Sequence, residues 1–355
     1  MAMLYECGFE AGSWAYYQAN GWTSAGTPTF FTAAGSYHTS MSSNGGVRSF
    51  CPAWSSTISP NLGANDGWMS FWLAPMVGAT GGTRDCEPTF FASYDGTGAD
   101  YAQASVNFSR YGCITVLTSG LYVIDGVSAS FNPAVSHWIS IYMKCRYFSG
   151  VFPYTTAGNV KVYIDGVKVI DYSGNLAYYI YPDHLTQWNK VGWQGAFNGI
   201  IVDDLVIHDD DFTGPLPERF IPAIVPNGDN AIELTRSTGS TNYSCVDEIP
   251  PVTTDYCSTA ITNKADHYNM TTIGWTPDTI DAVGVWTYAM QNGTIVDVRH
   301  GLYNSSGPTE YTKTKTLTTS GTYYADLYIF ETEPISSTAW DKTEIDAAVS
   351  TARLV

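Results

Sequence analysis

Positive charge is scarce in this sequence and absent from long parts of it. No lysine precedes Lys144, and the only arginines before it are Arg48, Arg84 and Arg110. Over the whole chain, 33 acidic residues stand against 16 basic ones, which gives a formal net charge of −17. A protein with this balance repels nucleic acid and anionic lipid surfaces, so neither is an expected partner.

Long apolar runs and paired cysteines are also missing. No stretch approaches the roughly 20 apolar residues that span a bilayer, so no membrane insertion is expected. The start, Met1–Cys7, has neither the basic region nor the apolar core of a secretion signal, which predicts folding in a cytoplasm. The seven cysteines include no Cys-x-x-Cys pair. We therefore expect no zinc site, and thiols that stay reduced and mostly buried.

The common hydrolase motifs are absent as well. There is no Gly-x-Ser-x-Gly sequence, and no two of the six histidines are four residues apart, as metal-binding pairs are. A glycosidase needs two carboxylates across the scissile bond. The glutamates never form the Glu-x-Asp-x-Glu type of strand, and the nearest approach is Glu344-Ile-Asp346. The sequence therefore predicts a protein that is not an enzyme, with an endoglycosidase as the least favoured function.

What the sequence does contain is a strong signal for antiparallel β-structure. Apolar residues alternate on both sides of Asp165-Gly166, from Val160 to Val169, and Asp-Gly between alternating strands indicates a tight hairpin turn. Gly67–Leu73 alternates in the same way, and Cys113–Leu117 with Gly120–Ile124 reads as a second hairpin. No sustained helical period occurs before residue 340. The predicted fold class is therefore all-β.

The order of these strands resembles a known fold family. The first of these strands is His137–Lys144, which has a tryptophan near its start. The "VYIDG" hairpin follows it, and the strand "VDDLVI" at Val202–Ile207 closes the series. Together with the opening Glu6–Glu10, this order resembles the concanavalin A-like (laminin G-like) lectin and glucanase sandwich. The resemblance implies an antiparallel jelly-roll over residues 1–213. That family includes lectins, hydrolases and structural modules, so the resemblance does not select an activity.

A second resemblance begins where the composition changes. Gly214, Pro215 and Pro217 predict a linker over residues 214–220. Beyond it, the order "VPNG", then "VDEIPP", then "DYC" resembles the C-terminal half of structural proteins of tailed bacteriophages. Residues 221–355 are expected to form a smaller antiparallel β-module for virion docking and oligomerisation. It ends in a short helix, because Asp341 and Glu344 have capping-box spacing; the pairing of the last six residues stays open.

Two groups of residues are candidate binding sites. The aromatic-rich insertion offers stacking faces and hydrogen bonds to a glycan or a protein, and its candidates are Tyr178, Tyr179, Tyr181, His184 and Trp188. Aspartates gather around the closing strand at Asp203, Asp204 and Asp209–Asp211. Since laminin G-like domains often hold calcium at a rim, Asp209 and Asp211 are weak calcium candidates; the alternative is an acidic solvated turn. No other cofactor is expected.

The two resemblances and the missing motifs together favour one function. The chain is expected to be a non-enzymatic structural component of a bacteriophage particle, such as a capsid decoration, a tail fibre or another tail-associated protein. Its expected partners are other virion proteins and further copies of itself, with a trimer favoured and the strand Ile280–Ala289 as the contact. It is expected to reside in the virion. The alternative is a carbohydrate-binding module or adhesin that recognises host-surface polysaccharide.

Overall fold

The computed structural model describes residues 3–9, 14–19, 22–24, 29–31, 49–51, 55–58, 66–76, 85–94, 100–118, 122–144, 158–174, 185–194, 201–209, 214–249, 251–304 and 309–355. These residues form two compact units. The first contains the described residues up to Ile221 except helix α1 (Trp14–Ala19). The second contains α1 and the described residues from Pro222 onward.

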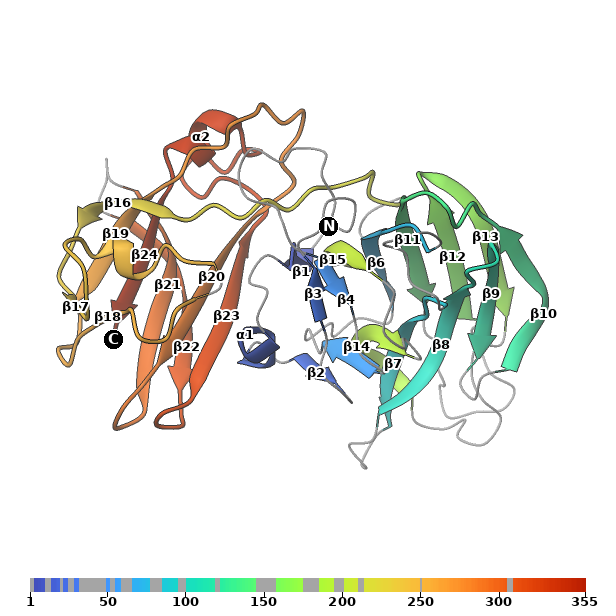
Figure 1. Cartoon of the computed structure of the whole chain (residues 1–355), viewed down its shortest axis with the longest axis horizontal. Coiled ribbons are helices and arrows are strands. Elements are labelled where there is room, and N and C mark those ends of the chain that lie inside the picture. Colours follow the sequence, from blue (N-terminus) through green and yellow to red (C-terminus); the bar gives the residue numbers. More distant parts are fainter. Residues whose placement is uncertain are drawn as a thin grey trace. The chain divides into compact units, whose positions relative to one another are not determined.

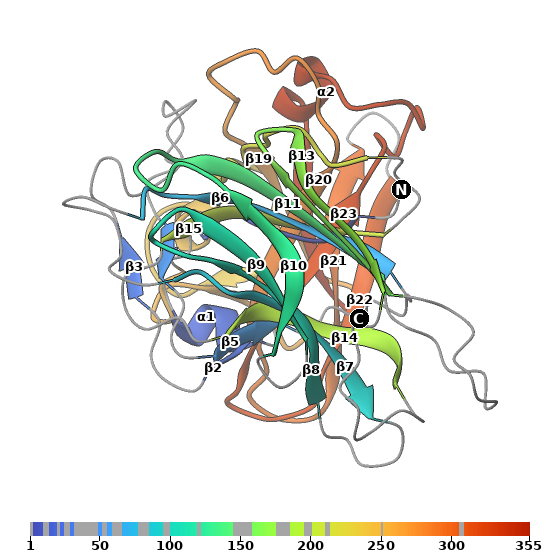
Figure 2. The same cartoon turned by 90° about the vertical axis from the view of Figure 1, so that its right-hand side faces the viewer.

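The first unit is a sandwich of two antiparallel sheets, seen edge-on in Figure 2. One sheet has the order β13-β12-β11-β6-β15-β4-β3, and β1 pairs with β15. Its strands are β1 (Met3–Cys7), β3 (Thr29–Phe31), β4 (Ser49–Cys51), β6 (Asp66–Leu73), β11 (His137–Lys144), β12 (Gly158–Ile164), β13 (Val167–Gly174) and β15 (Val202–His208). The predicted all-β fold class is confirmed.

The second sheet of the sandwich has the order β10-β9-β8-β7-β14-β5-β2. Its strands are β2 (Trp22–Ser24), β5 (Ser55–Ile58), β7 (Pro88–Tyr94), β8 (Asp100–Phe108), β9 (Cys113–Thr118), β10 (Tyr122–Ser130) and β14 (Leu185–Gln194). Phe71 of β6 meets Trp193 of β14 edge to face, with ring centroids 5.6 Å apart. Ile139 and Ile141 of β11 are fully buried, so the core lies between the two sheets.

The opposite face of the first sheet is buried too, which alternation alone did not indicate. Trp72 and Trp138 face each other across β6 and β11 and pack with Leu216. The Trp138 indole N–H donates to the Leu216 carbonyl oxygen at 2.9 Å, and Leu216 is 1% exposed. The segment 214–220, predicted to be an extended linker, is thus held on the sandwich at Leu216, because this leucine fills an apolar site there.

The predicted hairpin turn joins β12 and β13. Asp165 and Gly166 both have positive φ, 50° and 78°, as the tight turn requires. The Asp165 carboxylate also accepts the Trp138 backbone N–H at 2.9 Å and lies 2.7 Å from His137 Nδ1. The turn is thus connected to the start of β11, and the hairpin prediction is confirmed.

Replacing Gly166 with alanine should lower the free energy of unfolding by about 1 kcal/mol, because a Cβ is strained at positive φ. An added Cβ meets no atom within 4 Å, so crowding plays no part. Gly214 offers the matched control, since its surroundings are equally open and its φ is not positive. Urea unfolding should show a lower free energy of unfolding for Gly166→Ala and no decrease for Gly214→Ala. Equal effects of the two substitutions would contradict the explanation by strain at positive φ.

The second unit has its own sheets, coloured yellow to red in Figure 1. A five-stranded antiparallel sheet has the order β16-β19-β24-β21-β22, and β20 pairs with β23 in a smaller sheet. The strands are β16 (Pro226–Ala231), β17 (Thr235–Arg236), β18 (Cys257–Ser258), β19 (Ala265–Met270), β20 (Val283–Met290), β21 (Val296–Asn304), β22 (Thr309–Leu317), β23 (Tyr323–Phe330) and β24 (Val349–Leu354). The last strand, whose pairing the sequence left open, lies between β19 and β21.

The core of this unit lies between its two sheets. Leu302 of β21 and Phe330 of β23 cluster with Trp340 and with Ile345 of helix α2 (Lys342–Asp346). The Asp341 side chain accepts the Glu344 backbone N–H, and the Glu344 side chain accepts the Asp341 backbone N–H. This capping box, predicted from the sequence, begins the helix that carries Ile345 into the core.

Helix α1 was not predicted, and it belongs to the second unit. Six residues are too few to display a helical period, and no acidic residue marks its first turn. Tyr16 packs against Trp286 and Tyr288 of β20, with ring centroids 5.9 and 5.3 Å apart. The helix therefore covers the face of the β20–β23 sheet that points away from the core.

Five cysteines whose side chains the structure describes are free thiols: Cys7, Cys86, Cys113, Cys245 and Cys257. Burial raises the pKa of the Cys257 thiol to about 12, which disfavours the reactive thiolate at neutral pH. Among the helices that the structure describes, neither length nor apolar character is sufficient to cross a bilayer.

Candidate functional site

The aromatic site predicted in the insertion cannot be located. Tyr178, Tyr179, Tyr181 and His184 lie outside the described residues. Trp188 lies in β14, where its backbone pairs with Ala92, and its side chain is outside the described set. Contact of this group with a glycan or a protein stays a prediction.

Of the acidic group around the closing strand, the structure describes Asp203, Asp204 and Asp209. Asp203 and Asp204 are buried, and Asp204 accepts the Ile221 backbone N–H at 2.9 Å. Asp203 accepts the Asp204 N–H at 2.9 Å, so both carboxylates bind the chain's own backbone. Asp209 follows β15 half-buried, and Asp211 is not described. Among the residues with described positions, no three His, Cys, Asp or Glu side chains are grouped to hold a metal.

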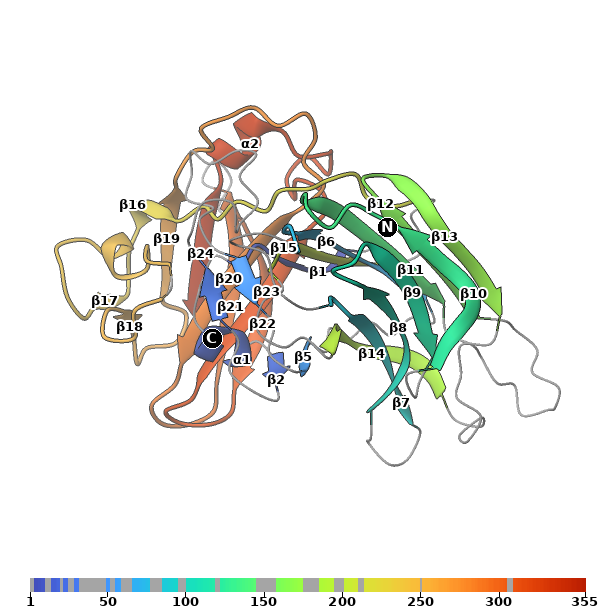
Figure 3. The same cartoon turned by 45° about the vertical axis from the view of Figure 1, so that its right-hand side comes forward.

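One segment of the second unit combines exposed apolar side chains with a fixed backbone. Eleven large apolar side chains of the described residues are exposed, and six of them fall in the single segment 232–261. These six are Ile232, Val246, Ile249, Val252, Tyr256 and Ile261, and we refer to them as the loop surface. The segment extends beyond β16 and β19 and includes the small β17–β18 pair (Figures 1 and 3).

One buried carboxylate holds the base of this segment. Asp266 of β19 is fully buried, and its Oδ1 accepts the backbone N–H groups of Glu233 and Leu234 at 2.7 and 2.8 Å. Its Oδ2 accepts the Asn242 side-chain amide and the Tyr268 hydroxyl, both at 2.7 Å. Four donors on one carboxylate satisfy its buried charge and connect the loop to the sheet.

Further contacts fix the middle of the segment. Asp229 of β16 accepts the backbone N–H groups of Asn242 and Tyr243 at 3.1 and 2.7 Å, which holds the start of a short 3-10 helix, Tyr243–Cys245. Farther along the segment, the Tyr323 hydroxyl of β23 donates to the Thr253 carbonyl oxygen at 3.2 Å. The exposed apolar residues between these points are therefore carried by an anchored backbone.

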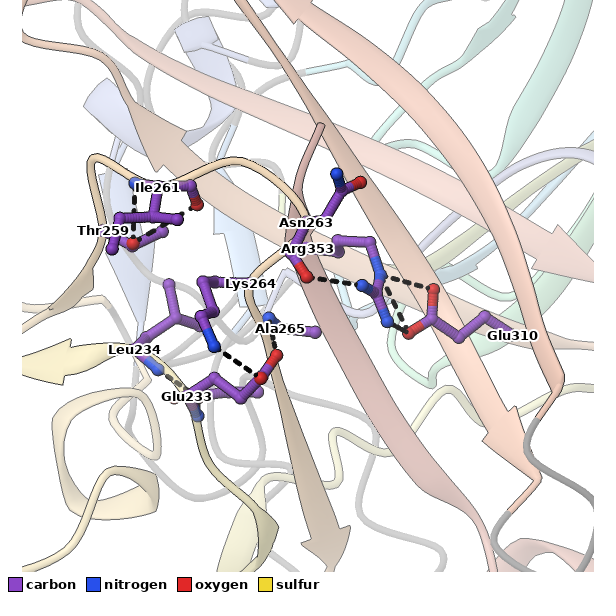
Figure 4. Close-up of polar contacts among 10 residues, drawn as sticks. Glu233, Leu234, Thr259, Ile261, Asn263, Lys264, Ala265, Glu310 and Arg353 are labelled. Carbon is purple, nitrogen blue, oxygen red and sulfur yellow. Dashed lines mark hydrogen bonds and ion pairs between the residues drawn. The ribbon is translucent and has the colours of Figure 1, made fainter.

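The ends of the segment are joined to the sheet by one ion pair and by hydrogen bonds, shown in Figure 4. The Glu233 carboxylate binds the Lys264 ammonium at 2.9 Å and the Ala265 backbone N–H at 3.0 Å. The hydrogen bond from Lys264 is the main reason that the pKa of Glu233 is lowered. The Arg353 guanidinium donates to the Asn263 carbonyl oxygen at 2.7 Å, just beyond Ile261.

The sequence indicated part of this surface. The quoted "VDEIPP" and "DYC" motifs lie within it, but Asp266 was not singled out. An aspartate inside an alternating strand looks like any solvent-facing acid, and its four donors come mostly from distant loop residues. Its one sequence signal is Tyr268 two positions later on the same face, whose hydroxyl reaches it.

Comparisons with known proteins leave this chain's family open. No protein-family model and no curated protein sequence matches it. Among solved structures, a Bacillus subtilis protein of unknown function with a galectin-like fold is 11% identical, with a TM-score of 0.34, covering 59% of this chain and 96% of that one. The tandem CBM22 domains of Paenibacillus barcinonensis Xyn10C are 12% identical, with a TM-score of 0.26, covering 100% and 90%.

A Trypanosoma rangeli sialidase is also similar in part. It is 10% identical with a TM-score of 0.29, and the match covers 45% of this chain but only 25% of the sialidase. This chain spans about a quarter of that enzyme, and none of these TM-scores exceeds 0.34.

Proposed function

We propose that the chain is a non-enzymatic structural component of a tailed-bacteriophage particle that acts through protein–protein contacts. The observation that carries the proposal is the loop surface, on which six large apolar side chains are exposed while the backbone beneath them is fixed. Groups of exposed apolar side chains commonly mark interaction sites. A loop that is already ordered also loses little conformational entropy on binding.

The charges around the loop surface indicate the kind of partner. Asp247 and Glu248 lie between Val246 and Ile249. Burial raises the pKa of Glu248, and the negative charges of Asp247 and Asp255 raise it further. Negative charge is therefore crowded at the rim of an apolar surface. The occupant we infer is another virion protein with an apolar patch bordered by lysine or arginine, because that arrangement relieves the crowding.

The sequence resemblance supports the same assignment. The segment that resembles phage structural proteins, from Pro226-Asn-Gly228 to Asp255-Tyr-Cys257, includes most of the loop surface. In this proposal the chain folds in the host cytoplasm and then joins the particle as a decoration, fibre or tail-associated protein. Host-glycan binding is an added activity and not the main one.

The experiment is quantitative mass spectrometry of particles purified from lysates of the phage that encodes the chain. Wild-type chain should be present at a stoichiometric copy number. Particles assembled with Ile249→Asp should carry at least tenfold fewer copies, because a buried charge disrupts an apolar contact. Ile295→Asp is the matched control, since Ile295 is exposed but lies outside the loop surface. Particles without the wild-type chain, or equal incorporation of both variants, would overturn the proposal.

Self-association, with a trimer favoured, belongs to the same proposal, with the strand Ile280–Ala289 as the expected contact. Val283 of this strand packs against the core, and Tyr16 packs against Trp286 on the other face. All residues of β20 are nevertheless half-buried, so both faces keep partly exposed side chains. Light scattering of the purified full chain at micromolar concentration measures the assembly state directly, and a monomer there would remove the trimer from the proposal.

A further inference from the structure

On one face of the five-stranded sheet, side chains from four strands converge. The rings of His267 on β19 and Tyr303 on β21 stack with centroids 3.9 Å apart. Glu310 on β22 lies 3.8 Å from His267 Nε2 and binds Arg353 on β24 with two oxygens, at 2.9 Å to Nε and 2.5 Å to Nη2. Strands β24 and β21 separate β19 from β22. These side chains therefore meet above the two central strands, and we call them the convergent cluster.

Beneath the convergent cluster are two buried polar atoms. Thr351 of β24 lies directly opposite His267 on one side and Gly301 on the other, so its side chain shares their face. Thr351 is 3% exposed and His267 is 8% exposed. Among the described residues, neither Thr351 Oγ1 nor His267 Nδ1 has a hydrogen-bond partner. Leaving such groups unsatisfied is costly and uncommon in folded proteins.

The charges of the cluster indicate what kind of group fits. Burial lowers the pKa of His267; the charge of Glu310 opposes this shift, and that of Arg353 reinforces it. The lowered pKa favours the neutral imidazole, which has one N–H donor and one nitrogen acceptor. The Arg353 guanidinium and the Glu310 carboxylate compensate each other. A neutral ligand with several hydroxyls, each both donor and acceptor, matches this set better than an anion or a cation.

We propose that the convergent cluster is a binding site for a neutral saccharide. Sugar hydroxyls supply donors and acceptors for His267 Nδ1 and Thr351 Oγ1, and the half-buried Tyr303 ring suits the apolar face of a pyranose. Since both polar atoms are shielded from solvent, a covering side chain moves when the sugar enters. Tyr303, which is stacked on His267, is the side chain we assign to this movement. The site is on the second unit and shares no residue with the loop surface, although Arg353 also binds the Asn263 carbonyl oxygen just beyond that segment.

The test uses the full chain and three probes: the methyl glycosides of glucose, galactose and N-acetylglucosamine. Saturation-transfer difference NMR should show saturable binding of at least one, with a Kd on the order of 1 mM or tighter. The Tyr303 ring resonances should shift during the same titration. Thr351→Val should weaken the binding at least tenfold, because it removes the hydroxyl and keeps the shape.

Two controls keep the outcome interpretable. Thr351→Val removes a hydroxyl that has no partner, so it should fold as stably as the wild type in a thermal melt. Thr314→Val changes an exposed threonine of β22 on the same face and should leave the binding unchanged. Absence of binding by all three probes, or equal binding by Thr351→Val, would mean that the two atoms hold only a buried water, and would overturn the proposal. Thr351→Val should still enter particles normally, which separates this test from that of the proposed function.

Discussion

Replacing Asp266 with alanine is expected to unfold or strongly destabilise the second unit, with a loss of about 4 kcal/mol. The change removes one carboxylate and leaves the Glu233 and Leu234 N–H groups, the Asn242 amide and the Tyr268 hydroxyl without their acceptor. Each unsatisfied buried donor costs about 1–3 kcal/mol. Even with partial access of water to the loop, the sum exceeds the effect of a typical single substitution.

Chemical unfolding followed by tryptophan fluorescence measures this loss, with Asp278→Asn as the control. Asp278 is exposed and makes no hydrogen bond described for the chain, so its replacement should be neutral. The loss of unfolding free energy for Asp266→Asn should fall between those for Asp266→Ala and Asp278→Asn, because the amide keeps one acceptor oxygen and adds a donor facing other donors. A neutral Asp266→Ala would mean that the loop is not held by this carboxylate, and the support for a preformed loop surface would be lost.

Asp326 is expected to produce the second large effect, and to make it depend on pH. It accepts from the fully buried His300 at 2.9 Å and binds the Lys313 ammonium at 3.2 Å, joining β23 to β21 and β22. His300 Nδ1 has no partner among the described residues, so Asp326 is the acceptor on which the imidazole depends. Asp326→Ala should therefore cost about 2–3 kcal/mol.

The direction of the pH effect follows from the pKa of Asp326. Burial raises this pKa, but the hydrogen bond from His300 and the charge of Lys313 outweigh burial and lower it overall. A carboxyl with a lowered folded pKa stabilises the protein above its unfolded pKa, about 3.9 for aspartate, and this contribution is lost as the pH falls through the folded value. In thermal melts between pH 7 and pH 2, the melting temperature of the wild type should fall steeply at the acid end. Asp326→Asn should make that fall shallower, and an unchanged pH dependence would contradict the assignment.

The local features of the fold could be predicted from the sequence, while those that depend on distant residues could not. The Asp165-Gly166 turn and the Asp341–Glu344 capping box follow from a few neighbouring residues, and both are confirmed. The alternation of Gly67–Leu73 predicts a strand but not that both its faces are buried. That outcome depends on Leu216, far along the chain, which packs beside Trp72.

The candidate sites show the same limit more clearly. The acidic group at Asp203–Asp211 was read as one feature because its members are adjacent in sequence. The fold buries Asp203 and Asp204 against the backbone. The convergent cluster, in contrast, brings together residues from strands that are far apart in the sequence, such as His267 and Glu310. No spacing rule connects such residues, because their proximity is created by sheet pairing.

Helix α1 has a consequence for the order in which the chain folds during synthesis. Tyr16 of this helix is translated well before Trp286 and Tyr288, on which it packs. At 5–20 residues per second, a ribosome needs roughly a quarter of a minute to a minute to supply those partners. Throughout that time α1 has no β20 strand to pack on. The sandwich can form first, but the second unit is complete only after β20 has been made and α1 packs against it.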